Sequence, residues 1–239
     1  MNRYSRLARI INQDQILKLQ KSTVMIVGIG GVGAMACEIL ARSAVGTLII
    51  VDNDVIQLTN INRQIHATDK TINLSKTNVM AERINDIDPN CKVVKYDCFF
   101  NNESEYLFDQ HIDYVIDAID TVSAKLDLIE ICHKKAIPII SCMGMGNRLD
   151  PTQVIYTELN KTEGDPLAKA MRIQARKRMI DYTINVVFSV ERPKSLDKPF
   201  DEKDNKNGKV PPGSSAFVPN TAGIFLASYV VRKLIERVD

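Results

Sequence analysis

The chain has 239 residues, enough for one large α/β domain with a substantial core. Hydrophobic residues make up 45% and charged residues 25%, as in globular proteins, and a net charge of +2 is too small to indicate nucleic-acid binding by itself. No apolar run is long enough for a membrane span, and the five cysteines form no CxxC pair, which favours reduced thiols in the cytoplasm over a zinc site.

The first part of the chain predicts a helical arm followed by a nucleotide-binding unit. In residues 1–22 apolar side chains recur at helical spacing between basic ones. Residues 24–40 then read VMIVGIGGVGAMACEIL, which is a short β-branched strand, a glycine turn and an apolar helix. Glycines in such a turn let the backbone bend tightly and approach a phosphate at the helix N-terminus. The glycines that we expect at the nucleotide are Gly28, Gly30, Gly31 and Gly33.

Residues 23–150 are expected to form a Rossmann-like, mostly parallel sheet with helices on both faces, because strands and helices alternate along them. Asp52 ends the strand predicted at 47–51, at the spacing where a carboxylate usually bonds a ribose hydroxyl. Residues 55–73 show no periodicity and are long for a connection, which is typical of functional segments. The remaining elements are helices at 74–87 and 124–135 and strands at 92–96, 114–119 and 137–142.

Residues 151–239 are predicted to be an antiparallel and helical C-terminal extension, packed on the same domain. Its expected elements are strands at 154–159 and 184–190 and helices at 166–180 and 221–237. Residues 192–215 are polar and proline-rich, so we expect a mobile surface loop that acts either as a linker or as a functional lid. The helix at 166–180 has a basic face that could contact RNA phosphates, although a solvated face is the simpler interpretation. The residues of that face are Lys169, Arg172 and Arg176.

Charged and polar side chains follow several of the predicted strands. In an open α/β sheet the carboxyl ends of the strands share one crevice. Fixed cations there suit a triphosphate, because they neutralise charge on the phosphates, and a carboxylate can hold Mg²⁺. A nicotinamide would leave these cations unexplained, so an oxidoreductase is the least favoured function. The side chains expected at the crevice are Asp52, Asp54, Asn60, Arg63, Gln64, Lys76 and Asp120.

The motifs GIGGVG, DND, TNINRQ and DAIDT, together with Lys76, resemble in order and spacing the ATP-binding residues of the E1-like family. That family includes the activating enzymes of molybdopterin, thiamine and ubiquitin-like pathways. The resemblance implies that Asp52 binds the ribose and Asp120 carries Mg²⁺. Asp117 alternates with apolar residues, which favours a structural role for it. The resemblance also implies a homodimer in which Arg6 reaches into the neighbouring site, and it leaves room for a structural Na⁺ or K⁺ ion. The residues implied to bind the phosphates are Asn60, Arg63 and Lys76.

Five longer stretches look like the tRNA threonylcarbamoyladenosine dehydratase branch of this family. The resemblance implies that the carboxylate of N6-threonylcarbamoyladenosine at position 37 of tRNA is adenylated and then cyclises, releasing AMP and pyrophosphate. Ring closure within one nucleotide needs no enzyme thiol. Cys142, at the end of a buried strand, is therefore expected to be an inert core thiol. The stretches are NRQIHA at 62–67, VMAERI at 79–84, YVIDAID at 114–120, DPTQV at 150–154 and DPLAKAMR at 165–172.

Two other functions stay open at this point. One is an activator of a ubiquitin-like or sulfur-carrier protein, against which the missing zinc cysteines count. The other is a non-catalytic E1-like binding subunit, which would be expected to lack some of the charged residues that this chain retains. A cysteine-desulfurase or sulfur-acceptor system is a further candidate partner. Some members of the family associate peripherally with membranes through their closing segment, but at this length we expect the last helix to pack on the domain.

Overall fold

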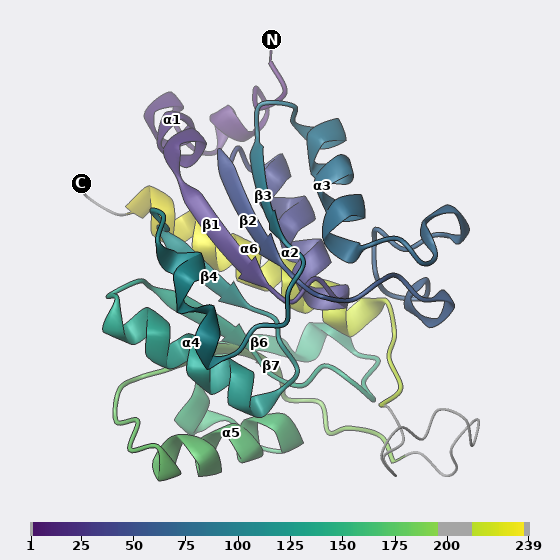
Figure 1. Cartoon of the computed structure of the whole chain (residues 1–239), viewed down its shortest axis with the longest axis vertical. Helices are drawn as coiled ribbons and strands as arrows, with labels where there is room; N and C mark the ends of the chain where they lie inside the picture. Colours follow the sequence, from purple (N-terminus) through teal and green to yellow (C-terminus); the bar gives the residue numbers. More distant parts are fainter. Residues whose placement is uncertain (1, 196–211, 237–239) are drawn as a thin grey trace.

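A seven-stranded sheet in the order β3-β2-β1-β4-β5-β7-β6 lies at the centre of the computed structural model, which describes residues 2–195 and 212–236 (Figure 1). All of these strands run parallel except β6, which pairs antiparallel with β7 at one edge. The expected α/β fold with a mostly parallel sheet is confirmed. The strands are β1 Thr23–Val27, β2 Thr47–Val51, β3 Lys92–Tyr96, β4 Tyr114–Asp117, β5 Ile139–Cys142, β6 Val154–Glu158 and β7 Asn185–Ser189.

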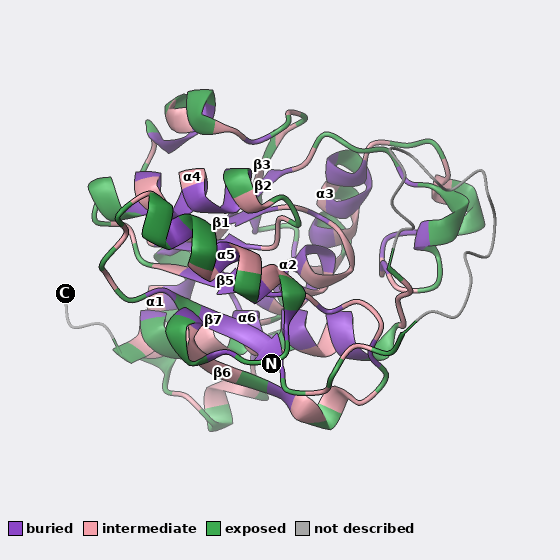
Figure 2. Cartoon of the chain, turned by 90° about the horizontal axis from the view of Figure 1, so that it is seen from below, coloured by how far each residue is buried: buried purple, intermediate pink, exposed green. Residues whose placement is uncertain are grey.

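Helices cover both faces of the sheet, because alternate strand residues are apolar on opposite sides. Val24 and Ile26 pack in the cluster formed with α2, α3 and α6, whereas Met25 and Val27 pack in the cluster formed with α4. The buried residues are concentrated in the sheet and on the inward sides of these helices (Figure 2). The helices are α1 Gln13–Lys21, α2 Gly31–Arg42, α3 Lys76–Ile87, α4 Val122–Lys134, α5 Pro166–Lys177 and α6 Phe217–Glu236.

The N-terminal arm consists of a 3₁₀ turn at Leu7–Arg9 and helix α1 rather than one helix. Asn12 separates the two because it caps α1. Its side chain accepts a hydrogen bond from the Gln15 N–H, and its backbone N–H donates to Gln15 Oε1. The arm is held on the end of α3, where Arg3 lies 3.0 Å from Asp88. It therefore lies at the end of the sheet where the strands begin (Figure 1).

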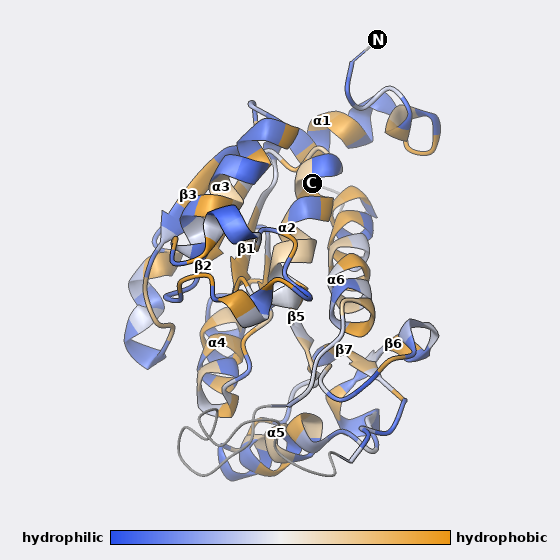
Figure 3. Ribbon diagram, turned by 90° about the vertical axis from the view of Figure 1, so that its right-hand side faces the viewer, coloured by the Kyte–Doolittle hydropathy of each residue, from blue (hydrophilic) through white to orange (hydrophobic). Residues whose placement is uncertain are grey.

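The C-terminal part of the chain extends the same sheet. β7 pairs in parallel with β5 and antiparallel with β6, so the strands of the predicted antiparallel and helical extension continue the central sheet. Helix α6 begins at Phe217, four residues earlier than expected, and its apolar side packs against α2 (Figure 3). No helix within the described ranges has both the length and the apolar character needed to cross a membrane. Most of the predicted loop at 192–215, residues 196–211, lies outside the described part of the chain.

Candidate functional site

A pocket of ≈ 680 Å³ opens beyond the carboxyl ends of the parallel strands. In the sheet, β2 and β3 lie on one side of β1, and β4, β5 and β7 lie on the other. Strand order therefore reverses between β1 and β4, and the loops that follow them, at Gly28 and Ala118, both line the pocket. Ligands of open α/β sheets bind at this kind of switch point. The pocket therefore lies where the sequence motifs predict it.

The glycine turn after β1 requires glycine for two separate reasons. Gly28 has a φ of 91°, and a Cβ at this position would lie 2.7 Å from the carbonyl oxygen of Ala118. A Cβ on Gly33 would lie 1.8 Å from the carbonyl oxygen of Gly28, so only glycine lets α2 pack this closely. Helix α2 begins without a side-chain cap, and its first residues line the pocket. Its unpaired N–H groups can therefore receive an anion.

Asp52 closes β2 with its carboxylate turned back toward the glycine turn. One oxygen accepts a hydrogen bond from the Ile29 N–H at 2.6 Å, and the other accepts one from the Asp54 N–H at 2.8 Å. Burial raises the pKa of Asp52, while the nearby Lys76 ammonium and these two N–H donors oppose that increase. The side chain thus has a fixed orientation at the pocket wall, which suits recognition of a hydroxyl group.

Lys76 is the first residue of α3 and is only 6% exposed. Its Nζ lies 2.6 Å from a carboxylate oxygen of Asp54 and 3.9 Å from one of Asp52. Ser75 starts the helix by accepting a hydrogen bond from the Asn78 N–H. Lys76 is therefore a buried, paired cation on the pocket wall and not a solvated lysine at a helix start.

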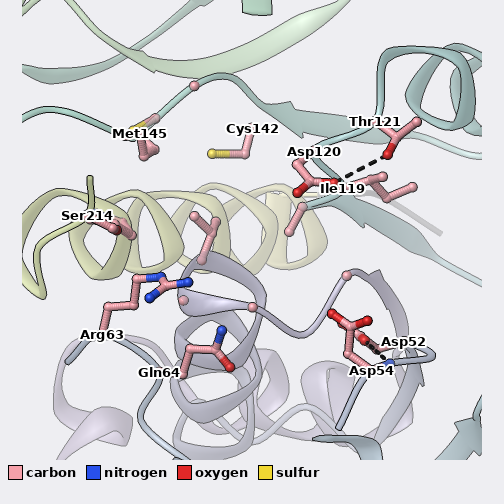
Figure 4. A pocket seen from close by; sticks show the side chains of 18 of the residues that line it. Asp52, Asp54, Arg63, Gln64, Ile119, Asp120, Thr121, Cys142, Met145 and Ser214 are labelled. Carbon is pink, nitrogen blue, oxygen red and sulfur yellow. Dashed lines mark hydrogen bonds between the residues drawn. The ribbon is translucent and has the colours of Figure 1, made fainter. Parts of the chain in front are cut away.

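Arg63 lies in the irregular segment between β2 and α3, and its guanidinium points into the pocket (Figure 4). It donates to the Thr59 carbonyl at 2.8 Å and to Asn62 Oδ1 at 2.9 Å. Within residues 2–195 and 212–236 no carboxylate forms an ion pair with it, and partial burial lowers its pKa. The pocket therefore contains a cation that is free to bind an anion.

Two amide side chains complete this wall. Asn60 is buried and its Oδ1 accepts from the Gln57 N–H, which closes the 3₁₀ turn at Leu58–Asn60. Gln64 is 5% exposed, and its Oε1 accepts no hydrogen bond from any described residue. A buried amide oxygen without a donor is costly unless a ligand or water satisfies it. Gln64 therefore also points to a polar ligand.

Asp120 is exposed at the pocket, on the loop that follows β4. A buried ion pair supports this loop: Lys125 of α4 lies 2.8 Å from Asp117, and both side chains are fully buried. Lys125 also donates to the Ile119 carbonyl at 3.0 Å, and Asp117 accepts from the Ile119 N–H and from Ser141. Asp117 thus has the structural place expected for it. Lys125 was missed, although a lysine among the apolar residues of its helix was a usable signal.

Four of the predicted site residues were expected elsewhere, Arg6 at a neighbouring subunit's site and Lys169, Arg172 and Arg176 on an RNA-binding face, and none of them lines this pocket. Arg6 is exposed on the arm, at the far end of the sheet, so it is remote from the pocket of its own chain. Lys169 and Arg176 are exposed on the outer side of α5. Arg172 differs from them: one of its guanidinium nitrogens donates to the Thr162 carbonyl at 2.8 Å. One of the three side chains is therefore engaged with the segment before α5.

The other wall of the pocket was not predicted at all. It is built by the loops after β5 and β7 and by the segment before α6. Cys142 lies there, and burial raises the pKa of its thiol to about 12. The motifs at 150–154 and 165–172 gave no sign that their segments belong to this wall, because the residues that meet there are distant along the chain.

Known proteins resemble this chain in sequence and in structure. The sequence matches the ThiF family over residues 4–237. A tRNA threonylcarbamoyladenosine dehydratase of Bacillus subtilis strain 168 is 39% identical over 246 residues, which cover 100% of this chain and 97% of that protein. The crystal structure of E. coli tRNA N6-threonylcarbamoyladenosine dehydratase in complex with ATP matches with a TM-score of 0.87 at 33% identity, covering 98% of this chain and 94% of that one. A molybdopterin-synthase adenylyltransferase of Haemophilus influenzae is 29% identical over 71% of this chain and 70% of its own length.

The buried pair under the Asp120 loop gives a stability prediction. Replacing Lys125 with Met should lower the free energy of unfolding by about 3–5 kcal/mol, because Asp117 would remain buried without its counter-charge. Urea unfolding followed by circular dichroism measures this change. Lys134→Met is the matched control, since Lys134 is an exposed residue of the same helix that pairs with Glu105. Its unfolding curve should stay close to wild type, and equal losses in the two variants would contradict the prediction.

Proposed function

The chain belongs to the ThiF family, and on this basis we propose that it is an enzyme that catalyses the ATP-dependent dehydration of N6-threonylcarbamoyladenosine at position 37 of tRNA. The observation that carries the proposal is the likeness to the dehydratases over the whole chain. The pocket supports it, because a free cation, an uncapped helix N-terminus and a fixed carboxylate line one cavity. These features suit ATP better than an uncharged ligand.

The proposed ATP contacts follow from the pocket wall. Asp52 would accept a ribose hydroxyl, and Arg63 and Lys76 would bind the phosphates together with Asn60 and the N–H groups at the start of α2. Asp54 would remain the partner of Lys76. Gln64 Oε1 would gain the donor that it lacks, through a bound water or a ligand hydroxyl.

Mg²⁺ fits the same wall. Asp120 is an exposed carboxylate on the pocket, and the described residues contain no cluster of three or more metal-binding side chains. Mg²⁺ commonly takes one or two protein carboxylates and completes its shell with phosphate oxygens and water. When bound, the ion would neutralise part of the phosphate charge.

The proposed reaction has two steps. The substrate carboxylate attacks the α-phosphorus of ATP and displaces pyrophosphate, while Arg63 and Lys76 stabilise the added negative charge. The neighbouring carbamoyl group then attacks the activated carbonyl carbon, and the C–O bond to AMP breaks. One carboxylate oxygen leaves with AMP and the nucleoside loses one water in total. The second step is intramolecular, so the enzyme needs to hold its substrate rather than to supply a nucleophile.

The structure does not favour Cys142 as the thiol of a ubiquitin-type activator. Such an activator forms a thioester with a reactive cysteine, whereas burial raises the pKa of Cys142 to about 12 and leaves it protonated at neutral pH. The molybdopterin-synthase relative also covers less of this chain than the Bacillus subtilis dehydratase does. The activator of a carrier protein is therefore the second candidate function.

The proposed partners are tRNA and a second copy of this chain. Lys169 and Arg176 are exposed and could contact tRNA phosphates. Arg6 lies too far from its own pocket to act there, so its proposed role requires a homodimer. A cytoplasmic location is also proposed, supported by five cysteines without disulfides. No contact in the described structure bears on a sulfur-transfer partner.

The decisive experiment incubates the protein with ATP, Mg²⁺ and tRNA that carries the modified nucleoside, and follows the nucleoside by mass spectrometry. Loss of one water with release of AMP is the expected result. Lys76→Ala and Asp120→Ala should each lower AMP formation by at least about 100-fold, because each loses charge stabilisation at the phosphates. Lys70→Ala is the control, because it changes an exposed lysine in the segment between β2 and α3 that does not line the pocket. This variant should leave activity unchanged. Adenylation of a diglycine peptide instead of the tRNA would favour the activator.

Cys142→Ser tests the absence of a thioester. The variant should keep most of its turnover, whereas removal of a nucleophilic thiol would lower the rate by orders of magnitude. Cys132→Ser is the control for the cost of burying a hydroxyl group, because Cys132 is also fully buried but lies outside the pocket. Loss of turnover in Cys142→Ser alone, with folding retained, would argue for a thioester.

Arg6→Ala tests whether the arm acts between subunits. Mixing inactive Arg6→Ala and Asp120→Ala chains should restore roughly a quarter of the wild-type rate, because half of the dimers would be mixed and each would hold one complete site. AMP formation after mixing measures this recovery. Arg9→Ala, an exposed arginine of the same arm, should be active without mixing. A monomer with full activity would rule out the role of Arg6.

A further inference from the structure

The pocket has a second half, which the proposed ATP contacts do not use. Ser214 and Met145 lie across the cavity from Asp52 and Asp54 (Figure 4). This half is lined mainly by small and apolar residues, among them Met145, Gly146, Leu167, Pro193 and Ser214. Among the described residues that line it, Arg148 is the one with a charged side chain, and it is only 2% exposed. The surface that these described residues offer to a ligand is therefore neutral.

Arg148 directs its guanidinium into the wall instead of into the cavity. It donates to the Glu191 carbonyl at 2.8 Å, to the carbonyls of Gly144 and Gly146, and to Asp165 at 2.9 Å. The other oxygen of Asp165 accepts from the Ala168 N–H at 2.7 Å and so caps α5. One buried side chain thereby ties the loop after β5 to the end of β7 and to the start of α5.

Asn147 makes the complementary connection through its backbone and its amide. It has a φ of 59°, its N–H donates to the Gly213 carbonyl at 2.7 Å, and its Oδ1 accepts from the Gly213 N–H at 2.6 Å. The Lys194 N–H donates to its carbonyl at 2.8 Å. Asn62 then donates to the Ser214 carbonyl at 2.9 Å, which joins this wall to the segment that carries Arg63. We call Asn147, Arg148 and Asp165 together the wall clamp.

A neutral wall of proline, glycine and methionine cannot stabilise a polyphosphate, which would lose its hydration without gaining counter-charges. It suits a flat, uncharged group with amide edges, since rings pack on apolar side chains and amides bond to exposed backbone groups. We propose that this half seats the purine and carbamoyl part of the modified nucleoside, and that Arg148 is a positioning residue that builds the seat. The inference rests on the proposed function and adds to it the site of the acceptor.

Arg148→Met tests the positioning role. The tRNA-dependent kcat/KM for AMP formation should fall by roughly 100-fold, because the acceptor loses its alignment with the α-phosphate, while the Kd for ATP measured by calorimetry should change less than about twofold. Arg148→Lys should recover part of the loss, since an ammonium can still bond one or two of the carbonyls.

Arg178→Met is the matched control. Arg178 also joins α5 to another element, through Asp127 and Glu130 at 2.6 Å each, but it does not line the pocket. It should change neither the Kd for ATP nor the use of tRNA. If Arg148→Met weakens ATP binding as much as it weakens tRNA use, or if it folds and alters neither, the positioning role is wrong.

A pair of filling variants keeps the inference testable if Arg148→Met fails to fold. Ser214→Trp places an indole in the neutral half of the pocket. Cys98→Trp places one just after β3, which pairs with β2, the strand that precedes Asp52. The first should raise the KM for modified tRNA at least about tenfold with ATP binding retained, and the second should raise the Kd for ATP. The reverse pattern would overturn the assignment of the two halves. If the wild-type protein makes no AMP with modified tRNA, the proposed function is refuted. The Kd values for ATP of the Ser214→Trp and Cys98→Trp variants would still show which half of the pocket binds ATP.

Discussion

The close approach between the glycine turn and the loop after β4 is the constraint on which the site depends. Gly28 lies so near the Ala118 carbonyl that no side chain fits between them. Each of the two loops is also held by a carboxylate: Asp52 bonds the N–H of Ile29, and Asp117 bonds the N–H of Ile119. Because these contacts close the switch point from both sides, the ends of β1, β2 and β4 form one rigid floor.

Lys76 and Arg63, the two cations on the charged side of the pocket, differ in the partners that they already have. Lys76 is already paired with carboxylates, so a phosphate has to share it with Asp52 and Asp54. Arg63 bonds only to neutral oxygens among the described residues, and burial lowers its pKa, so an anion would relieve an existing cost. Binding of a polyphosphate should therefore be driven more by Arg63 than by Lys76.

The extension of the sheet explains how one cavity can hold two reactants. The loop after β5 forms part of the wall opposite the proposed phosphate contacts, and β7 with the segments around it completes that wall. The wall clamp keeps that side neutral by turning Arg148 inward. Charge is thus concentrated where phosphates would bind, and the acceptor side can bind an uncharged group without competing for them.

Local patterns in the sequence determined the sheet, the glycine turn and the polar residues at the strand ends. Asp52, Lys76 and Asp120 could be found because each lies at or just after the end of a strand or at the start of a helix, where position along the chain implies position in space. The pairs Lys125–Asp117 and Arg148–Asp165 could not, since nothing in the sequence marks which buried charges will meet. Arg172 gives a third example: helical periodicity gives the face of its side chain, but only the packed structure shows that it donates to the Thr162 carbonyl before α5. The sequence by itself therefore determined the fold and the charged side of the pocket, and the tertiary structure alone decided the opposite, neutral side, because its hydrogen bonds join segments that are far apart along the chain.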